Sequence, residues 1–479
     1  MNKLCRYTLS QVLELLELGK VTSEELTRAC LEEIESTKDL NALISVDHKY
    51  ALSEAKKADE RRRVGEKLPL LGVPVIIKDN ISTEHFKTTC ASKFLANYVA
   101  PYEATVVKRL REAGAVIIAK ANMDEFACGA SGENSAFGAT LNPVDKTRVA
   151  GGSSSGSASS VSAYNAYASL GTDTGGSIRQ PAGFCGVVGM KPTYGRVSRY
   201  GVVAFASSLD QVGPITRTVE DNAKILEIIS GKDEMDSTSA NVPVENYSFA
   251  VNESIKGKRI GVAKEYFALE ASPEVRREIE RTIEFYRENG AEIVNISLPN
   301  VSKALAVYYI LSSAELSSNL SRFDGIKYGE RGENYDGVVD LYYKSRSKGF
   351  GAEVKRRIMT GNYSLSAGYF DAYYKKASDV REILKKEFAD AFSKCDAIIS
   401  PVSPTTAFKV GEKKTPLENY LADIYTVPVN IVGVPAISFP VGKDSEGLPI
   451  ACQLIANYFD EKTLYSLAGC YERIHGGVR

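Results

Sequence analysis

The sequence contains no tryptophan and only three histidines in 479 residues: His48, His85 and His475. So few histidines leave little material for a histidine-rich metal centre and few candidates for a histidine base. None of the three lies in a glycine-rich motif. The eight cysteines form no C-x-x-C pair, so we expect buried free thiols in a reducing compartment and no zinc site.

An excess of one charge and long apolar runs are also missing. The formal net charge is −1, which lacks the basic excess of an autonomous nucleic-acid-binding protein. No run of about 18 apolar residues occurs, so we expect no membrane-spanning helix. Glu14 and Glu17 interrupt the first apolar stretch, which is therefore not a signal peptide. A composition of 44% hydrophobic and 25% charged residues is typical of a cytoplasmic globular protein with a large core.

The sequence does contain two clusters of glycine and serine. The first is GGSSSGS at residues 151–157, and the second is GTDTGGSIRQPAG at residues 171–183. The small, apolar segment between them predicts one short, tightly buried helix. Glycine lets the backbone turn sharply and lets its N–H groups approach a ligand. Each cluster therefore offers a hydroxyl beside amide donors, as acyl transfer requires for its nucleophile and its oxyanion.

A serine nucleophile needs a base, and one lysine fits this role. The apolar run LGVPVII at residues 71–77 ends at Lys78 and predicts a buried strand that delivers Lys78 at its C-terminal end. Ligand sites of open α/β sheets lie at that end. A buried lysine acts as a base when burial lowers its pKa enough to leave the amine uncharged.

This order of a lysine at a strand end, a GGSS loop and a DTGGSIR-P turn resembles the amidase signature family. The resemblance implies that Lys78 is the base and Ser177 the nucleophile. It also implies that Ser153 bridges them and follows Gly152 through a cis peptide. The family's loop usually reads GGSSGGS, and this chain has Ser155 at the fifth position.

The turn that carries the nucleophile also predicts an oxyanion hole. The candidate donors are the backbone N–H groups of Thr174, Gly175, Gly176 and Ser177. Donors of this kind stabilise the charge that develops on the carbonyl oxygen.

A second interpretation of the first cluster stays open. Residues 152–156 match G-x-S-x-G, the nucleophile elbow of α/β-hydrolases, with Ser154 as nucleophile and His475 as its base. The elbow requires a preceding apolar strand, and DKTRVA at residues 145–150 makes a poor one.

A non-catalytic interpretation also stays open. In it, Ser153 and Ser177 cap helices, and Lys78 forms an ion pair with the adjacent Asp79.

The pattern of apolar strands and capped helices predicts an α/β fold: a large mixed sheet covered by helices on both faces. A strand ending at Lys78, a helix over residues 103–113 and a strand over residues 116–120 predict a parallel unit. Further strands are expected at residues 258–264, 290–299, 396–401, 434–442 and 449–456. Helices are expected at residues 8–18, from Thr22, at 48–63, at 273–289, through most of 300–390 and at the C-terminal end.

We expect one domain over residues 1–479. It would comprise an N-terminal helical segment (1–65), a core that carries the catalytic lysine and serines (66–260) and a mostly helical substrate-side region (300–390).

Within the family, three stretches are similar to the glutaminase subunits of tRNA-dependent amidotransferases. They are residues 317–331, 356–377 and 428–442. This resemblance implies that the substrate is glutamine. Arg357 would bind its α-carboxylate and Asp423 its α-ammonium group. Tyr308 matches a glutamine-contacting tyrosine, with Tyr309 as the neighbouring candidate.

The same resemblance implies partners. The released ammonia would pass to a B subunit, which binds the tRNA and uses ATP and Mg²⁺ to amidate Glu-tRNA(Gln), Asp-tRNA(Asn) or both. A small C subunit would complete a heterotrimer, and this chain itself would need no cofactor and no metal. Two other hypotheses are a stand-alone amidase for small or aryl amides and a non-catalytic assembly subunit.

Overall fold

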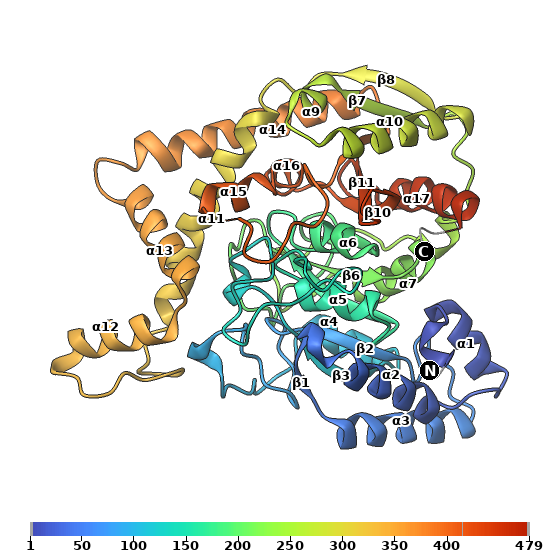
Figure 1. The fold of residues 1–479 in the computed structure, drawn as a ribbon, viewed down its shortest axis with the longest axis horizontal. Helices are drawn as coiled ribbons and strands as arrows, with labels where there is room; N and C mark the ends of the chain where they lie inside the picture. Colours follow the sequence, from blue (N-terminus) through green and yellow to red (C-terminus); the bar gives the residue numbers. More distant parts are fainter. Residues whose placement is uncertain (1–2, 414, 477–479) are drawn as a thin grey trace.

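The computed structural model describes residues 3–413 and 415–476 and contains one eleven-stranded mixed sheet (Figure 1). Its strand order is β1-β3-β2-β4-β6-β5-β10-β11-β9-β7-β8. The strands are β1 (Leu43–Val46), β2 (Pro74–Lys78), β3 (Val116–Ala121), β4 (Ala168–Asp173), β5 (Val188–Lys191), β6 (Gln211–Thr216), β7 (Arg259–Ala263), β8 (Glu292–Ile296), β9 (Ala397–Pro401), β10 (Ala436–Lys443) and β11 (Pro449–Ala456).

Helices follow the strands along the whole chain. They are α1 (Leu9–Glu17), α2 (Ser23–Ser36), α3 (His48–Arg63), α4 (Thr105–Glu112), α5 (Ser155–Ser162), α6 (Arg179–Cys185), α7 (Val219–Ile229), α8 (Tyr247–Ala250), α9 (Lys264–Ala268), α10 (Pro273–Glu288), α11 (Ala304–Asn319), α12 (Gly337–Gly349), α13 (Ala352–Leu365), α14 (Lys376–Phe392), α15 (Pro416–Leu421), α16 (Val427–Val432) and α17 (Glu461–His475). Within the described residues, no helix is long and apolar enough to cross a bilayer.

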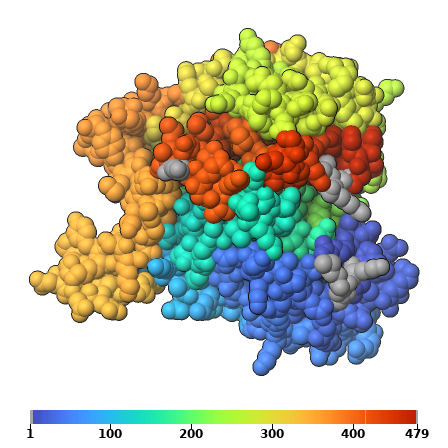
Figure 2. Space-filling model, viewed as in Figure 1, coloured from blue at the N-terminus to red at the C-terminus, as the bar shows by residue number. Residues whose placement is uncertain are grey.

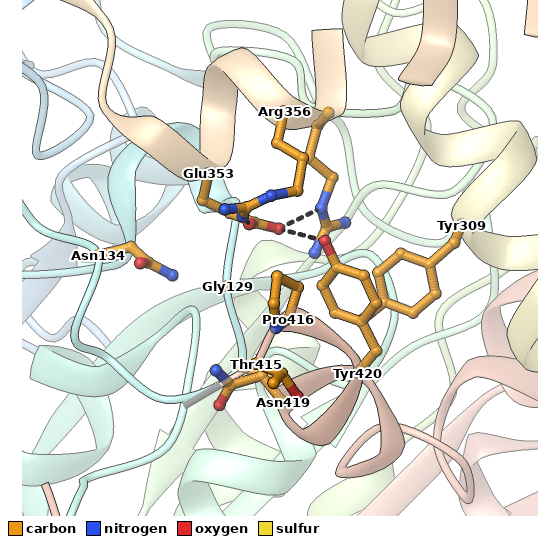
Figure 3. A pocket seen from close by; sticks show the side chains of 11 residues that line it. Gly129, Asn134, Tyr309, Glu353, Arg356, Thr415, Pro416, Asn419 and Tyr420 are labelled. Atoms are coloured by element: carbon orange, nitrogen blue, oxygen red, sulfur yellow. Dashed lines mark hydrogen bonds and ion pairs between the residues drawn. The ribbon is translucent and has the colours of Figure 1, made fainter. Parts of the chain in front are cut away.

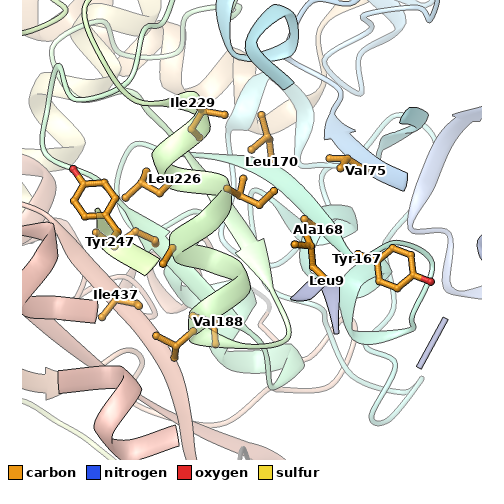
Figure 4. Packing of buried hydrophobic residues seen from close by; sticks show 14 of the residues in the cluster. Leu9, Val75, Tyr167, Ala168, Leu170, Val188, Leu226, Ile229, Tyr247 and Ile437 are labelled. Carbon is orange, nitrogen blue, oxygen red and sulfur yellow. The ribbon is translucent and has the colours of Figure 1, made fainter. Parts of the chain in front are cut away.

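Successive residues of the central strands point to opposite faces of the sheet, and each face has its own apolar core. Ile399 of β9 packs into a cluster that includes residues of α7, α10 and α17, and Figure 4 shows part of this cluster. Its neighbour Ile398 packs into a second cluster with residues of α11, α14 and α16. The alternation follows from the strand period of two. The predicted α/β fold, with helices on both faces of a mixed sheet, is therefore confirmed.

Local sequence signals located most of the elements correctly. Thr8 and Thr22 each begin a helix with a complete capping box. Ser272 caps α10, and Pro273 stands at its first position, where its missing N–H costs no hydrogen bond. Strand β2 pairs with β3 in parallel, as predicted from the helix between them. All eight cysteines are free and buried.

The prediction of one short helix between the two glycine–serine clusters was incomplete. Helix α5 is present, but the same segment continues into β4, which pairs with both β2 and β6. Every residue of β4 is buried, so the strand shows no polar–apolar alternation that would reveal it. Strand β6 was also missed, because Pro214 lies inside it and proline argues against a central strand.

The sheet draws its strands from Leu43 to Ala456, and this continuity supports the single-domain prediction. The region that was predicted to be mostly helical does form helices, α11 to α14. Helix α12 and its flanking loop project from the body of the molecule (Figures 1 and 2).

Gly156 on α5 provides a test of how tightly the first serine cluster packs. A Cβ at this position would lie 2.2 Å from the carbonyl oxygen of Ala42 and 2.5 Å from the backbone nitrogen of Asn122. Because backbone atoms cannot move aside easily, Gly156→Ala should lower the free energy of unfolding by about 1–3 kcal/mol. Urea denaturation followed by circular dichroism measures the change. Ser160→Ala on the same helix is the control, since the Ser160 hydroxyl donates only to Ser157; equal midpoints for both variants would contradict the prediction.

Candidate active site

Lys78 lies at the C-terminal end of β2, between β3 and β4, and is completely buried. Its Nζ donates to Ser153 Oγ at 2.8 Å, to Ser154 Oγ at 2.9 Å and to Thr172 Oγ1 at 2.8 Å. Burial lowers the pKa of Lys78 to about 7, although Asp124, Asp173 and Asp210 oppose the shift from a distance. Near neutral pH a large fraction of the amine is therefore uncharged, as a general base requires.

Asp79 does not pair with Lys78, which contradicts the non-catalytic interpretation. Its carboxylate accepts the backbone N–H groups of Thr89 and Ala91 and lies 3.4 Å from the buried ammonium of Lys120. Adjacent residues of an extended chain point to opposite sides, so Asp79 and Lys78 face different surroundings.

The loop that carries Ser153 is held by close backbone contacts. The Gly152–Ser153 peptide is cis, as the family resemblance implied. The Gly152 N–H donates to Gln180 Oε1 at 2.9 Å, and a Cβ at Gly152 would lie 2.0 Å from Asp124 Oδ2. Ser153 Oγ has Lys78 as its one hydrogen-bond partner within the described residues, so the remaining valence of this hydroxyl is available to a nucleophile or substrate. The departure from the family loop is accommodated: Ser155 Oγ donates to Thr140 Oγ1 at 3.1 Å.

Ser177 lies in the turn between β4 and α6, and a buried ion pair shapes this turn. Asp173 accepts the N–H groups of Gly176 (2.8 Å) and Ile178 (3.1 Å) and the Nε–H of Arg179 (3.1 Å). Burial alone would raise the pKa of Asp173, but the charge and hydrogen bonds of Arg179 outweigh it and lower this pKa to about 2. Ser177 is 8% exposed, and its hydroxyl makes no hydrogen bond within residues 3–413 and 415–476.

The two serine clusters meet at this turn. The Ser154 N–H donates to the carbonyl oxygen of Ser177 at 3.1 Å, so the loop of Ser153 and the turn of Ser177 are in direct contact. Lys78, Ser153 and Ser177 thus come from three adjoining segments of one buried region.

One predicted oxyanion donor needs correction. The Gly176 N–H already donates to Asp173, so it is not free to stabilise a substrate oxygen. In the part of the chain that the structure describes, the N–H groups of Thr174, Gly175 and Ser177 donate to no protein acceptor. These three groups are the donors that remain for an oxyanion.

The nucleophile-elbow interpretation loses its base. His475 stacks on Tyr471 with ring centroids 4.2 Å apart and also packs against Phe285. Ser154 Oγ instead accepts from Lys78 and donates to the carbonyl oxygen of Thr172 at 3.1 Å. The remaining histidines, His48 and His85, pair with surface carboxylates.

A polar pocket of about 160 Å³ opens beside this region (Figure 3). Arg357, on α13, is 4% exposed and lines it. Its guanidinium lies over the rings of Tyr309 and Tyr420, at 4.6 Å and 5.0 Å from their centroids. Its Nε donates to Glu353 Oε1 at 2.8 Å. The sequence pointed to Arg357 but missed Glu353 and Tyr420.

Asp423 is 8% exposed and accepts the hydroxyl of Tyr309 at 3.0 Å. Burial raises the pKa of Asp423 to about 7, while the Tyr309 hydrogen bond and the charge of Arg357 act against this shift. The pocket therefore contains one buried cation and one buried acid, the complement of a zwitterionic amino acid.

The two neighbouring tyrosines have different surroundings. Tyr309 lines the pocket and bonds to Asp423. Tyr308 packs against the nucleophile turn, where a Cβ at Gly175 would lie 2.5 Å from Tyr308 Cζ. Thr426 Oγ1 adds a second link, since it donates to the carbonyl oxygen of Gly175 at 2.7 Å. The pocket and the nucleophile turn are thus joined by direct contacts.

The chain belongs to the amidase family, whose model matches residues 25–465. The glutaminase-type A component of the glutamyl-tRNA(Gln) amidotransferase from Caldanaerobacter subterraneus subsp. tengcongensis is 55% identical over 470 residues, which cover 98% of this chain and 96% of that protein. The crystal structure of the corresponding glutamyl-tRNA(Gln) amidotransferase component from Thermotoga maritima has a TM-score of 0.81 at 42% identity, covering 97% of this chain and 94% of that chain. The peptide amidase from Stenotrophomonas maltophilia has a TM-score of 0.84 at 29% identity, covering 98% and 97%. The family predicted from the sequence is confirmed.

The lowered pKa of Lys78 generates a pH prediction. Amide hydrolysis should rise with pH through about 7, because the free amine is the active form. Below that pH, kcat should fall about tenfold per unit. Stopped assays across neutral pH measure this limb. Lys78→Arg, which stays protonated, should be inactive at every pH; a wild-type rate that is constant across neutral pH would contradict the role of Lys78.

Proposed function

We propose that this chain hydrolyses the side-chain amide of glutamine and supplies the ammonia to a tRNA-dependent amidotransferase. The single observation that carries the choice of substrate is the pairing of Arg357 and Asp423 in one buried pocket beside Ser177. A guanidinium suits a carboxylate, and a buried acid suits an ammonium group. Glutamine presents both charges on its α-carbon and an amide at the far end of its side chain.

The proposed chemistry begins at Ser177. Its Oγ attacks the amide carbon while its proton passes through the Ser153 hydroxyl to the uncharged amine of Lys78. The N–H groups of Thr174, Gly175 and Ser177 stabilise the negative charge on the carbonyl oxygen, and removal of one such donor costs about 10²–10³ in rate.

Collapse of the tetrahedral intermediate breaks the carbon–nitrogen bond. The departing nitrogen takes a proton from the Ser153 hydroxyl, which Lys78 reprotonates, and ammonia leaves. Water then attacks the glutamyl ester with Lys78 again as the base, and glutamate is released. Each of these steps is assigned to groups of this chain.

The partners follow from the same proposal. We assign the binding of tRNA, ATP and Mg²⁺ to a B subunit, while a small C subunit stabilises the assembly in a cytoplasmic heterotrimer. The net charge of −1 supports this division, because a chain that bound tRNA by itself would need a basic surface. The names of the relatives at more than half identity support it as well.

A stand-alone amidase is the second candidate. The observation in its favour is the structural likeness to a peptide amidase over nearly the whole chain. Such an enzyme would accept amides without α-substituent charges, whereas the pocket of Arg357 and Asp423 would leave those charges unpaired.

The nucleophile is tested by Ser177→Ala. Glutamine hydrolysis should fall at least about 10³-fold, because the covalent route is lost, while the melting temperature stays within a few degrees. Ser157→Ala is the matched control: it belongs to the same serine clusters, and its hydroxyl bonds only to the carbonyl oxygen of Leu170. A Ser177→Ala enzyme with full activity would refute the proposed mechanism. Mass spectrometry after treatment with an electrophilic glutamine analogue should locate the adduct on Ser177.

The partner assignment is tested by a glutaminase assay with and without co-expressed B and C subunits. We expect glutamine to be preferred over acetamide and the rate to increase in the assembled complex. Efficient acetamide hydrolysis by the isolated chain, with no response to the partners, would favour the stand-alone amidase.

A further inference from the structure

Arg357 and Asp423 share one buried pocket but do not bind each other. No ion pair joins them in the described residues, although the charge of Arg357 lowers the pKa of Asp423. In a region of low dielectric, an arginine and an acid this well buried gain free energy by direct contact. A direct contact would leave neither group free for a ligand. The structure must therefore hold them apart.

Arg357 is held by Glu353, one turn earlier on α13. Glu353 Oε1 accepts both the Nε–H of Arg357 and the hydroxyl of Tyr420, each at 2.8 Å. Its second oxygen accepts from Arg356. Figure 3 shows the bonds that Oε1 accepts beside the pocket. The Nε side of the guanidinium is thereby occupied, and its two terminal nitrogens make no hydrogen bond to the described protein.

Aromatic rings complete this clamp. Tyr309 and Tyr420 stack with centroids 4.0 Å apart, and the Arg357 guanidinium lies over both rings. Tyr309 also donates its hydroxyl to Asp423. Each charged group thus has a protein partner of its own, a carboxylate for the arginine and a phenol for the acid.

We propose that Glu353 is a positioning residue that keeps Arg357 away from Asp423 and so keeps both charges of the pocket open for an amino-acid zwitterion. The clamp makes the site specific for the charged α-carbon of the substrate. This inference rests on the proposed function, because it takes glutamine as the ligand.

The ordinary alternative is a helix-surface ion pair between residues four apart, which contributes little. Burial argues against it. The side chains of Glu353 and Arg357 are 10% and 5% exposed, whereas the comparable pair of Asp340 and Lys344 on α12 is 35% and 42% exposed. A carboxylate that is shared by Arg357 and Tyr420 inside a pocket defines a geometry, which a solvated surface pair does not.

Two variants test the clamp, assayed in the full-length chain with its partner subunits. In Glu353→Ala, Arg357 should rotate onto Asp423 and the KM for glutamine should rise at least about tenfold, the usual effect of losing a charged hydrogen bond. The kcat should change less than about threefold, because the nucleophile and its base are untouched. In Glu353→Gln, an oxygen acceptor remains for Arg357 and Tyr420, so the KM should recover in part.

The substrate comparison separates a positioning role from general damage. Propionamide carries no α-charges, so its kcat/KM should be the same in wild type and in Glu353→Ala. A crystal structure of Glu353→Ala should place the Arg357 guanidinium within ion-pair distance of Asp423. Asp340→Asn is the matched control and should leave both substrates unaffected.

The outcomes are distinguishable. A Glu353→Ala enzyme with an unchanged KM for glutamine, with equal losses for both substrates, or with Arg357 still in place would overturn the role of Glu353 while leaving the proposed function intact. A wild-type enzyme that prefers propionamide to glutamine would instead overturn the proposed function, and this inference with it.

Discussion

The site depends on one buried amine that is surrounded by hydroxyls. Lys78 has no exposure to solvent, and its partners are Ser153, Ser154 and Thr172. Hydroxyl groups can accept from an ammonium or donate to a free amine, so they satisfy Lys78 in both protonation states. A carboxylate at the same distance would instead stabilise the charged form. Asp79 points elsewhere and pairs with Lys120, which leaves the pKa of Lys78 to be set mainly by burial.

A second buried ion pair builds the turn that the amine serves. Arg179 binds Asp173 within the turn and also reaches Gln453 on β11 and Asn430 on α16, at 2.9 Å and 2.6 Å. Segments that lie far apart in the sequence therefore converge on the backbone next to Ser177. The same network occupies the Gly176 N–H and leaves the neighbouring amides of Thr174, Gly175 and Ser177 free, so structural and chemical roles are divided among consecutive residues.

Much of the fold and of the candidate site could be predicted because the signals are local. Capping boxes at Thr8 and Thr22 and the apolar run before Lys78 each depend on a few neighbouring residues. The missed features lacked such a signal. Strand β4 is buried on both faces and has no alternation, and Glu353 looks like any acid four residues before an arginine. The choice between Tyr308 and Tyr309 needed the contacts themselves, which place one on Gly175 and the other on Asp423.

By itself, the sequence determined the family, the α/β class and the residues able to act as base and nucleophile, because glycine turns, serines and a lysine after an apolar strand form a pattern readable along the chain. Only the tertiary structure decided which amides remain free, which acid pairs with which cation and which tyrosine lines the pocket. Those outcomes depend on partners that are distant in sequence, and a hydrogen bond or ion pair is assigned only when folding brings its two halves together.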